Sequence, residues 1–483
     1  MKFHFENLGS IKKAEVELGN LTVVCGKNNT GKTYLTYAVW GLLRHDMFFK
    51  AQLPEFPVPN FNKEQFTTEI LAGKKIVINL SDFDEVMNGA EVNLQKQADL
   101  NRLFNVNGNL FAQSTVNVSF NEPFTFLKEW VENMRLSLNA FKMNIDFNEK
   151  SYTLEIKFNL TEEVIRRHNG GNMMDKREFV VLLLDVLKEN IFRWYSHVHQ
   201  EKPFIYEKVS LIPSQREGIW SFQKELDKYR SNLITDLQKN PLINIDKVSS
   251  KYSFPIQEHI DFVRNIGKLE KYMSWEYENK EIVDYIEKEI LQLNYKQVEE
   301  EMMIEVGGKN IPLHVASSSV SVLLDIYLNI KYFLDKNYML MIDEPELSLH
   351  PENQIKLARL LVKLVNAGIK VWITTHSDYI VKELNNLLVL SNQMEGKAEL
   401  MAELGYVASD ILQKEDARFY ISYYDKELQG CTVEQITIDE WGLQKSAFDE
   451  AMVDIDRRTD KIFYAVNQQN DKHESNISQV TES

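Results

Sequence analysis

Apolar and polar positions alternate at the start of the chain, which predicts short β-strands. Residues 3–5 and 14–18 place apolar side chains at every second position, with a turn around Gly9 between them. The run 21–25 is almost continuously apolar, as expected of a central strand covered on both faces. A glycine-bounded loop follows, and residues 34–43 continue as a predicted helix.

The pattern changes between residues 44 and 205. Closely spaced prolines predict an irregular stretch, because proline fixes φ and lacks a backbone donor. Both strand-like and helix-like runs follow this stretch. The strand-like runs are 75–80, 115–120 and 152–158, and the helix-like runs are 124–141 and 177–198. We interpret this region as an α+β insertion.

Helical and hairpin patterns resume after the insertion. Residues 257–293 predict charged helix without sustained a/d heptads, so a long coiled coil is not expected. The runs 302–306 and 311–315 flank Gly307-Gly308, which predicts a hairpin with a glycine turn.

Composition and charge narrow the class of protein. The chain has 483 residues and a net charge of −16, so nucleic-acid binding would need a local basic patch. Its two cysteines, Cys25 and Cys431, form no disulfide framework and fit a reducing compartment. We find neither a signal peptide nor an apolar run of about 20 residues, the length a membrane helix needs. We therefore expect a cytoplasmic protein without a membrane partner.

A complete phosphate-loop motif, G-x-x-x-x-G-K-[ST], lies between the predicted central strand and the helix. Such a loop turns backbone N–H groups toward phosphates, while Lys32 reaches the β/γ-phosphates and the Thr33 hydroxyl ligates Mg²⁺. The alternative is a glycine turn with a solvated lysine. The residues expected to bind ATP here are Gly26, Asn28, Asn29, Thr30, Gly31, Lys32 and Thr33.

Two acidic residues follow an apolar strand predicted over 338–342. Ligands bind at the carboxyl ends of strands in open α/β sheets. We expect Asp343 to hold Mg²⁺ and Glu344 to orient and deprotonate the attacking water. Two acids after a strand are otherwise typical of a helix N-terminus.

The strand predicted over 370–374 ends in a histidine. His376 is placed to contact the γ-phosphate. The alternative is a hydrogen-bonded loop residue without a catalytic role.

Together these motifs resemble the ABC-type ATPases of the SMC and OLD group. The resemblance rests on the phosphate loop, on 343–346 with 349–351, and on 374–377, and it covers roughly residues 1–43 and 205–390. Within that group the chain is most similar to the standalone ATPases of bacterial anti-phage systems, such as those of PARIS and Septu. The resemblance implies ATP and Mg²⁺ as cofactors and a site shared between subunits.

The resemblance also assigns a signature-like segment, Ser317-Ser318-Ser319, to the γ-phosphate of the opposite subunit. Ser319 stands where a glycine is usual, and simple helix capping is the alternative. Gln215 could contact Mg²⁺ or the lytic water, and Arg216 a phosphate or an acidic neighbour, or both could be structural. The loop 347–351 would cross between subunits, and Pro351 would begin a helix.

Several other features are better explained by ordinary structural roles than by a function. Asp454 and Asp456 form an Asp-x-Asp pair, but the run 446–458 around them places its apolar residues at helical spacing and no clear strand precedes it, so we do not expect a Toprim nuclease. Short basic clusters and the aromatic run 192–195 suit solvated or packed helix faces. The adenine contact stays open among Phe3, Phe5 and Lys12.

The prediction is an α/β protein: an ABC-type P-loop ATPase head with an α+β insertion and a small C-terminal module. The expected segments are 1–43 and 206–390 (ATPase core), 44–205 (insertion), 391–466 (C-terminal module) and 467–483 (disordered tail). The resemblance implies a Mg²⁺-dependent ATPase that controls homo-oligomer assembly and holds or releases a protein effector, expected to be a nuclease, in anti-phage defence with a phage protein trigger. The alternatives are an SMC-like DNA-repair ATPase, although DNA is not the favoured partner, and the ATP subunit of a transporter.

Overall fold

The computed structural model describes most of residues 1–43 and 206–390 and parts of the predicted insertion. The described residues are 1–43, 61–79, 92–93, 97–119, 143–148, 150–151, 153–158, 160–161, 175–197, 208–222, 252–265, 279–298, 301–333 and 338–444, with a few isolated positions. The predicted helix 124–141 and the predicted tail 467–483 lie outside them.

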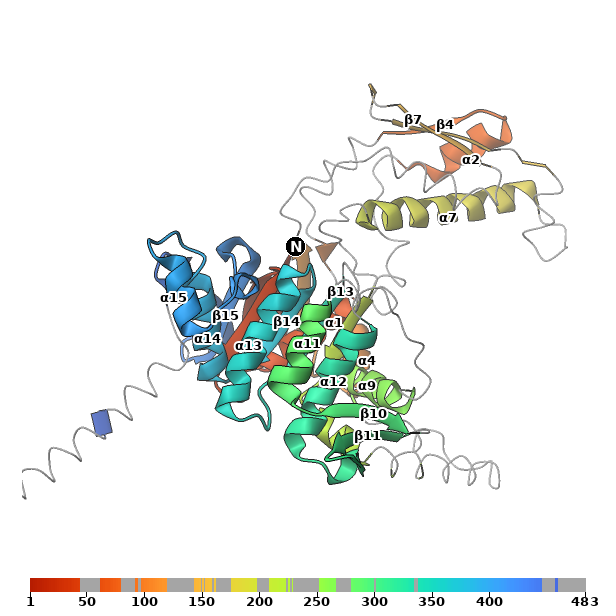
Figure 1. Ribbon diagram of the computed structural model, residues 1–483. Helices are drawn as coiled ribbons and strands as arrows, with labels where there is room; N and C mark the ends of the chain where they lie inside the picture. The colour runs from red at the N-terminus through yellow and green to blue at the C-terminus, as the bar shows by residue number, and fades with distance from the viewer. Residues whose placement is uncertain are drawn as a thin grey trace, which may run out of the picture.

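A ten-stranded mixed sheet runs through the molecule in the order β5-β6-β1-β2-β16-β15-β3-β14-β13-β9. Three of its strands, β13, β14 and β15, are labelled in Figure 1. Its strands are β1 (Lys2–Leu8), β2 (Ile11–Glu17), β3 (Leu21–Gly26), β5 (Val92–Asn93), β6 (Thr115–Ser119), β9 (Lys208–Ile212), β13 (Tyr338–Asp343), β14 (Lys370–Thr375), β15 (Ala417–Asp425) and β16 (Gly430–Ile436). Strands β15, β3, β14, β13 and β9 are parallel, so their carboxyl ends meet at one edge of the sheet.

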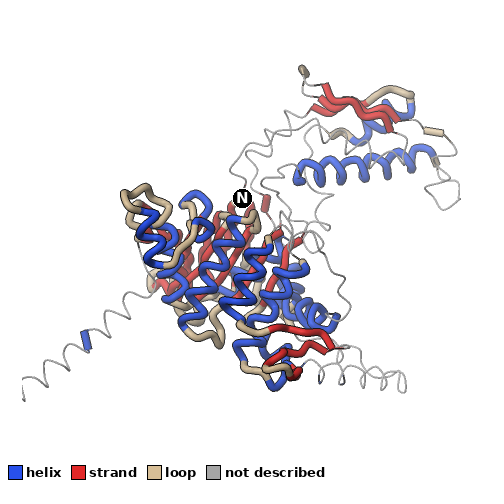
Figure 2. The backbone as a smooth tube through the Cα atoms, viewed as in Figure 1, coloured by secondary structure: helices blue, strands red, loops and turns tan. Residues whose placement is uncertain are grey.

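Helices cover both faces of this sheet, as Figure 2 shows. The side chain of Val24 packs in the cluster of α1 (Lys32–Leu43), whereas Val23 and Cys25 pack in the cluster on the opposite face. That opposite layer consists of α11 (Lys280–Tyr285), a π-helix (Ile286–Leu291), α12 (Ser318–Tyr332), α13 (Pro351–Asn366) and α14 (Asp378–Val389). All six positions of β3 are buried, which confirms the predicted central strand.

Part of the insertion forms an outlying α+β unit (Figure 1). It contains α2 (Lys63–Leu71), β4 (Ile76–Asn79), β7 (Met143–Asn148), β8 (Thr153–Phe158) and α7 (Lys176–His197). The strands form an antiparallel sheet in the order β4-β8-β7, and Lys63 Nζ on α2 lies 2.6 Å from Asp185 Oδ1 on α7. The aromatic run 192–195 lies on α7.

Two other segments join the main sheet from outside the predicted core. Residues 115–119, within the predicted insertion, pair as β6 with β1, and α4 (Gln97–Phe104) packs near α1. In the C-terminal region, β15 pairs with β3 and β16 pairs with β2. Buried Val116 and Val118 lie opposite Phe5 and Phe3 in register, and this apolar matching explains the pairing.

Smaller elements complete the described chain. They are α9 (Phe254–Asn265), β10 (Asn294–Val298), β11 (Glu301–Val306), β12 (Lys309–Pro312), α15 (Lys397–Leu404), β17 (Ile438–Asp439) and β18 (Gly442–Leu443). The predicted hairpin is β11–β12, but its second strand stops at Pro312, and 313–315 form a 3₁₀ turn instead of continuing it. None of the helices in the described ranges has the length and apolar character that a bilayer crossing requires.

Candidate nucleotide-binding site

The phosphate loop connects β3 to α1 and depends on two glycines. Gly26 has φ of +146°, and a Cβ there would lie 2.2 Å from the carbonyl oxygen of Ser422 on β15. Gly31 has φ of +94°, and its Cβ would lie 2.6 Å from Cγ1 of Ile11. The loop backbone is therefore held close to β15 and β2, in a form that only glycine allows. Helix α1 begins at Lys32, two residues earlier than predicted.

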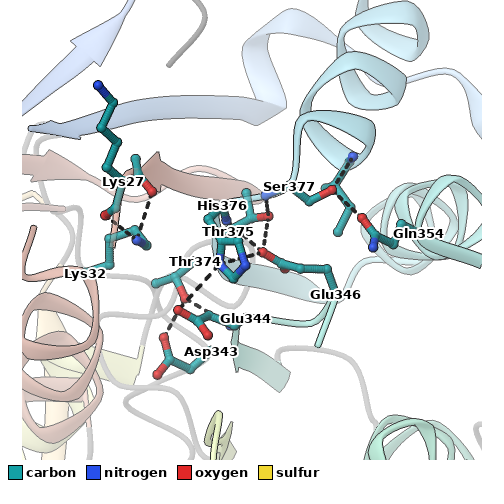
Figure 3. A network of polar contacts seen from close by, with 12 residues as sticks. Lys27, Lys32, Asp343, Glu344, Glu346, Gln354, Thr374, Thr375, His376 and Ser377 are labelled. Carbon is teal, nitrogen blue, oxygen red and sulfur yellow. Dashed lines mark hydrogen bonds and ion pairs between the residues drawn. The ribbon is translucent and has the colours of Figure 1, made fainter. Parts of the chain in front are cut away.

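Lys32 is buried beneath the loop. Its ammonium donates hydrogen bonds to the carbonyl oxygens of Gly26 and Lys27, each at 2.9 Å (Figure 3). Burial lowers the pKa of Lys32, and the carboxylates of Glu344 and Asp343 oppose that shift. The Lys27, Asn28 and Asn29 side chains are exposed, so this part of the loop is open to a ligand.

Asp343 ends β13 beside the phosphate loop. The Thr33 hydroxyl donates to its Oδ2 at 3.1 Å, and the Thr374 hydroxyl on β14 donates to its Oδ1 at 2.5 Å. Burial raises the pKa of Asp343, while bonds from Thr374, Thr33 and Ser214 hydroxyls lower it. Residues 310 positions apart thus meet, as the two motifs predicted.

The donor set at this point suits Mg²⁺. Thr33 and Asp343 offer a hydroxyl and a carboxylate oxygen, the hard ligands that Mg²⁺ prefers. Among the described residues, no group of three or more His, Cys, Asp or Glu side chains could hold a metal ion by itself. A magnesium ion here would therefore complete its coordination with phosphate oxygens and water, as is usual for this ion.

Glu344 has an uncommon backbone conformation, with φ of +53°. A non-glycine residue in this region costs about 1–3 kcal/mol and persists only where its surroundings hold it. Its N–H donates to both Oγ1 and the carbonyl oxygen of Thr374, at 3.0 and 3.2 Å. The Glu344 carboxylate still lies close enough to that of Asp343 for its charge to contribute to the raised pKa of Asp343.

His376 lies against the carboxylate of Glu344. Its Nδ1 is 3.6 Å from Glu344 Oε1 and 3.3 Å from Glu346 Oε1. The close approach of the imidazole to the Glu344 carboxylate lowers the pKa of Glu344 and raises the pKa of His376. The imidazole is therefore joined to both acids, in agreement with its predicted position at the site.

Glu346 is a site residue that the sequence reasoning missed. Its Oε1 accepts hydrogen bonds from the backbone N–H of His376 at 2.7 Å and from the Thr375 hydroxyl at 2.8 Å. It is only 4% exposed, and this burial raises the pKa of Glu346. Its place two residues after Glu344 was the only feature of the sequence that pointed to it. Its role in orienting the histidine loop depends on the contact between β13 and β14, which the sequence does not show.

Gln215 and Arg216 follow β9 and differ in their surroundings. Gln215 is exposed, and its Oε1 accepts a hydrogen bond from Tyr37 on α1 at 3.3 Å. Arg216 is fully buried, which favours the structural alternative over contact with a phosphate. Its guanidinium instead donates to the backbone carbonyls of Asp343 at 2.9 Å and Glu344 at 2.8 Å.

The signature-like serines are not brought to the phosphate loop. Ser317 and Ser318 are exposed at the start of α12, and within the described ranges no hydrogen bond joins Ser317–Ser319 to the site. Ser317 is the N-cap residue, yet its side chain makes no capping bond and instead lies 3.0 Å from the Ser319 hydroxyl. Simple capping therefore does not explain this segment.

The remaining predictions concern neighbouring loops. Pro351 begins α13, as predicted, with His350 as the N-cap residue. Phe3 and Phe5 are buried, which removes both as adenine contacts, whereas Lys12 is exposed. Asp454 and Asp456, the pair considered for a Toprim nuclease, lie outside the described ranges.

The sequence and the fold were compared with known proteins. No curated protein matches the chain. Similar solved structures include an SMC head bound to the C-winged helix domain of ScpA (TM-score 0.32, 10% identity, covering 91% of this chain and 98% of that one). Another is the SMC head domain from Thermotoga maritima (TM-score 0.30, 8% identity, 90% and 98% covered). Residues 1–381 match the AAA ATPase domain family (AAA_15), and with its phosphate loop and acidic strand end the chain belongs to this family of P-loop ATPases.

Proposed function

We propose that the protein hydrolyses ATP to ADP and phosphate with Mg²⁺. The observation that carries this proposal is the convergence of Lys32, Thr33, Asp343, Glu344 and His376 at the carboxyl edge of the parallel strands. A structural ion-pair network would not need the strained backbone of Glu344 or the glycine-dependent loop.

Each residue has a defined task in this reaction. Lys32 exchanges its bonds to the carbonyl oxygens of the loop for bonds to the β/γ-phosphates. Thr33 and Asp343 would hold Mg²⁺, which neutralises phosphate charge when bound. Glu344 accepts a proton from the water whose oxygen attacks the γ-phosphorus, and the bond from that phosphorus to the β-phosphate oxygen breaks. His376, oriented through Glu346, contacts the γ-phosphate.

The proposed site is completed by a second copy of the chain. Exposed Ser317 and Ser318 begin α12 away from the protein's own phosphate loop, and they are free to contact nucleotide held by another subunit. ATP then links two heads, and hydrolysis weakens the link because the γ-phosphate contacts are lost. A homo-oligomer controlled by ATP is the consequence.

We further propose, from the resemblance to anti-phage ATPases, that this cycle holds and releases a protein effector, in particular a nuclease, when a phage protein is detected. The outlying unit of α2, α7 and the β4-β8-β7 sheet supports this role, because it lies apart from the nucleotide site and offers surface for a partner (Figure 1). The protein would act in the cytoplasm.

The test is hydrolysis by the purified chain, measured as phosphate release with Mg²⁺ and with EDTA. Mg²⁺-dependent turnover that is lost in Lys32→Ala supports the proposal, and a folded wild-type chain without turnover refutes it. Salt-sensitive stimulation by duplex DNA would instead favour an SMC-like repair ATPase. Co-purification with a membrane protein would favour a transporter subunit.

A further inference from the structure

Arg216 is a buried cation that contacts the catalytic strand end without reaching the nucleotide. It is fully buried at the start of a helix over 216–222. Its Nη1 donates to the carbonyls of Pro213 and Asp343 at 3.1 and 2.9 Å, and its Nη2 donates to the carbonyl of Glu344 at 2.8 Å. The guanidinium therefore binds the carbonyl oxygens of both peptide groups that flank the Cα of Glu344.

These bonds complete the restraint on Glu344. The N–H of Glu344 is held by Thr374, as described above, and its carbonyl accepts hydrogen bonds from Arg216 at 2.8 Å and, more weakly, from the Leu347 N–H at 3.3 Å. A residue at φ of +53° relaxes to an ordinary conformation unless both flanking peptides are fixed. Because φ of Glu344 sets the direction of its side chain, the two restraints together determine where the carboxylate points.

The position of Arg216 is itself fixed from α12. Trp220, one turn further along the same helix, donates from Nε1 to Oδ1 of Asp325 on α12 at 3.0 Å. The other oxygen of Asp325 lies 3.2 Å from Nε2 of His259 on α9, and both of these side chains are buried. Burial lowers the pKa of Arg216, and among the charges that oppose this shift the Asp325 carboxylate ranks first.

We propose that Arg216 is a positioning residue for the general base. It keeps the backbone of Glu344 in the left-handed conformation and so directs the carboxylate toward the attacking water. Asp325 holds the segment that carries Arg216, and it lies on the same helix that begins with Ser317–Ser319. This inference rests on the proposed hydrolysis by Glu344.

If Arg216 positions the base, its loss lowers turnover more than nucleotide binding. Arg216 bonds only the backbone carbonyl of Asp343, and the side chains of Lys32, Thr33 and Asp343 make their contacts without it, so its loss should change Mg-ATP affinity only slightly. A displaced base does reduce turnover, because an error of about 1 Å in a reacting group costs about 10²-fold. A merely structural arginine would instead lower stability and leave the turnover of the folded fraction unchanged.

The experiment compares Arg216→Met and Arg216→Lys with the wild type. The expected result is that kcat falls about 10²-fold in Arg216→Met and about 10-fold in Arg216→Lys, whose single ammonium replaces only part of the guanidinium contacts. The Kd for Mg-ATP should change by less than about threefold in both. Arg359→Met and Arg359→Lys are the matched controls, because Arg359 on α13 also bonds a backbone carbonyl and a carboxylate, those of Gly405 and Glu383.

The outcomes separate the positioning role from the proposed reaction. Wild-type kcat in a folded Arg216→Lys or Arg216→Met variant overturns the positioning role, as does a loss of ATP affinity that matches the loss of turnover. If Arg216→Met does not fold, Arg216→Lys decides by the same criteria. An inactive wild type would refute the hydrolytic function itself, whereas an active wild type with unimpaired variants refutes only the role of Arg216.

Discussion

Replacing Glu344 by Gln tests the proposed base with little change to the fold. The backbone bonds of residue 344 are made with Thr374, Arg216 and Leu347 and do not involve its side chain, so the left-handed conformation should persist. The substitution removes the ionic contact with His376, whose Nδ1 lies 3.6 Å away. Because the Glu344 and His376 side chains are 23% and 38% exposed, that contact is worth at most about 1 kcal/mol.

The substitution should therefore change the activation free energy of hydrolysis more than the free energy of unfolding. Loss of a general base slows the chemical step by roughly 10²–10⁴, which corresponds to about 3–5 kcal/mol of activation free energy. The free energy of unfolding should change by no more than about 1 kcal/mol. Mg-ATP affinity should be kept, since Lys32, Thr33 and Asp343 are untouched.

The assay combines turnover, binding and assembly. Single-turnover phosphate release gives the rate, a fluorescent ATP analogue gives the affinity, and light scattering with Mg-ATP or ADP gives the assembly state. We expect Glu344→Gln to accumulate as a larger ATP-dependent species. Glu399→Gln, an exposed glutamate on α15, is the matched control and should behave as the wild type. Wild-type turnover in Glu344→Gln would refute its assignment as the base, whatever the assembly state.

Further substitutions test the other parts of the site. Lys32→Ala should abolish tight ATP binding and hydrolysis while thermal unfolding still shows a folded chain, and wild-type affinity would contradict the assignment. Gly26→Ala should lower the free energy of unfolding by about 2–5 kcal/mol and prevent ATP binding, because its Cβ would meet a β15 carbonyl at 2.2 Å. Gly308→Ala, where a Cβ meets nothing within 4 Å, is the control and should cost only about 1 kcal/mol. Adding Ser318→Arg to Glu344→Gln should prevent the ATP-dependent assembly seen by light scattering, and an unchanged assembly would exclude Ser318 from the interface.

The sequence by itself determined the local elements that bind nucleotide. The uninterrupted apolar run before the glycine loop predicts a strand buried on both faces, and the structure buries every position of β3. The two motifs likewise assigned Thr33 and Asp343 to the same Mg²⁺, and the structure brings them together at the carboxyl edge that the parallel strands share. These are properties of short segments with strong periodicity or fixed chemistry.

Only the tertiary structure decided which distant segments complete the sheet and the site. Periodicity identified 115–120 as a strand, but its pairing with β1 depends on matching buried side chains, and a segment's own pattern does not specify its partner. The sequence likewise does not specify the hydrogen-bond partners of Arg216 and Glu346. Their roles come from main-chain oxygens and N–H groups that lie 127 and 30 positions away, at strand ends made adjacent by the sheet. A hydrogen bond to a backbone atom places no constraint on the residue type that supplies that atom. The sequence therefore shows the charged side chain but not the backbone atom that it binds.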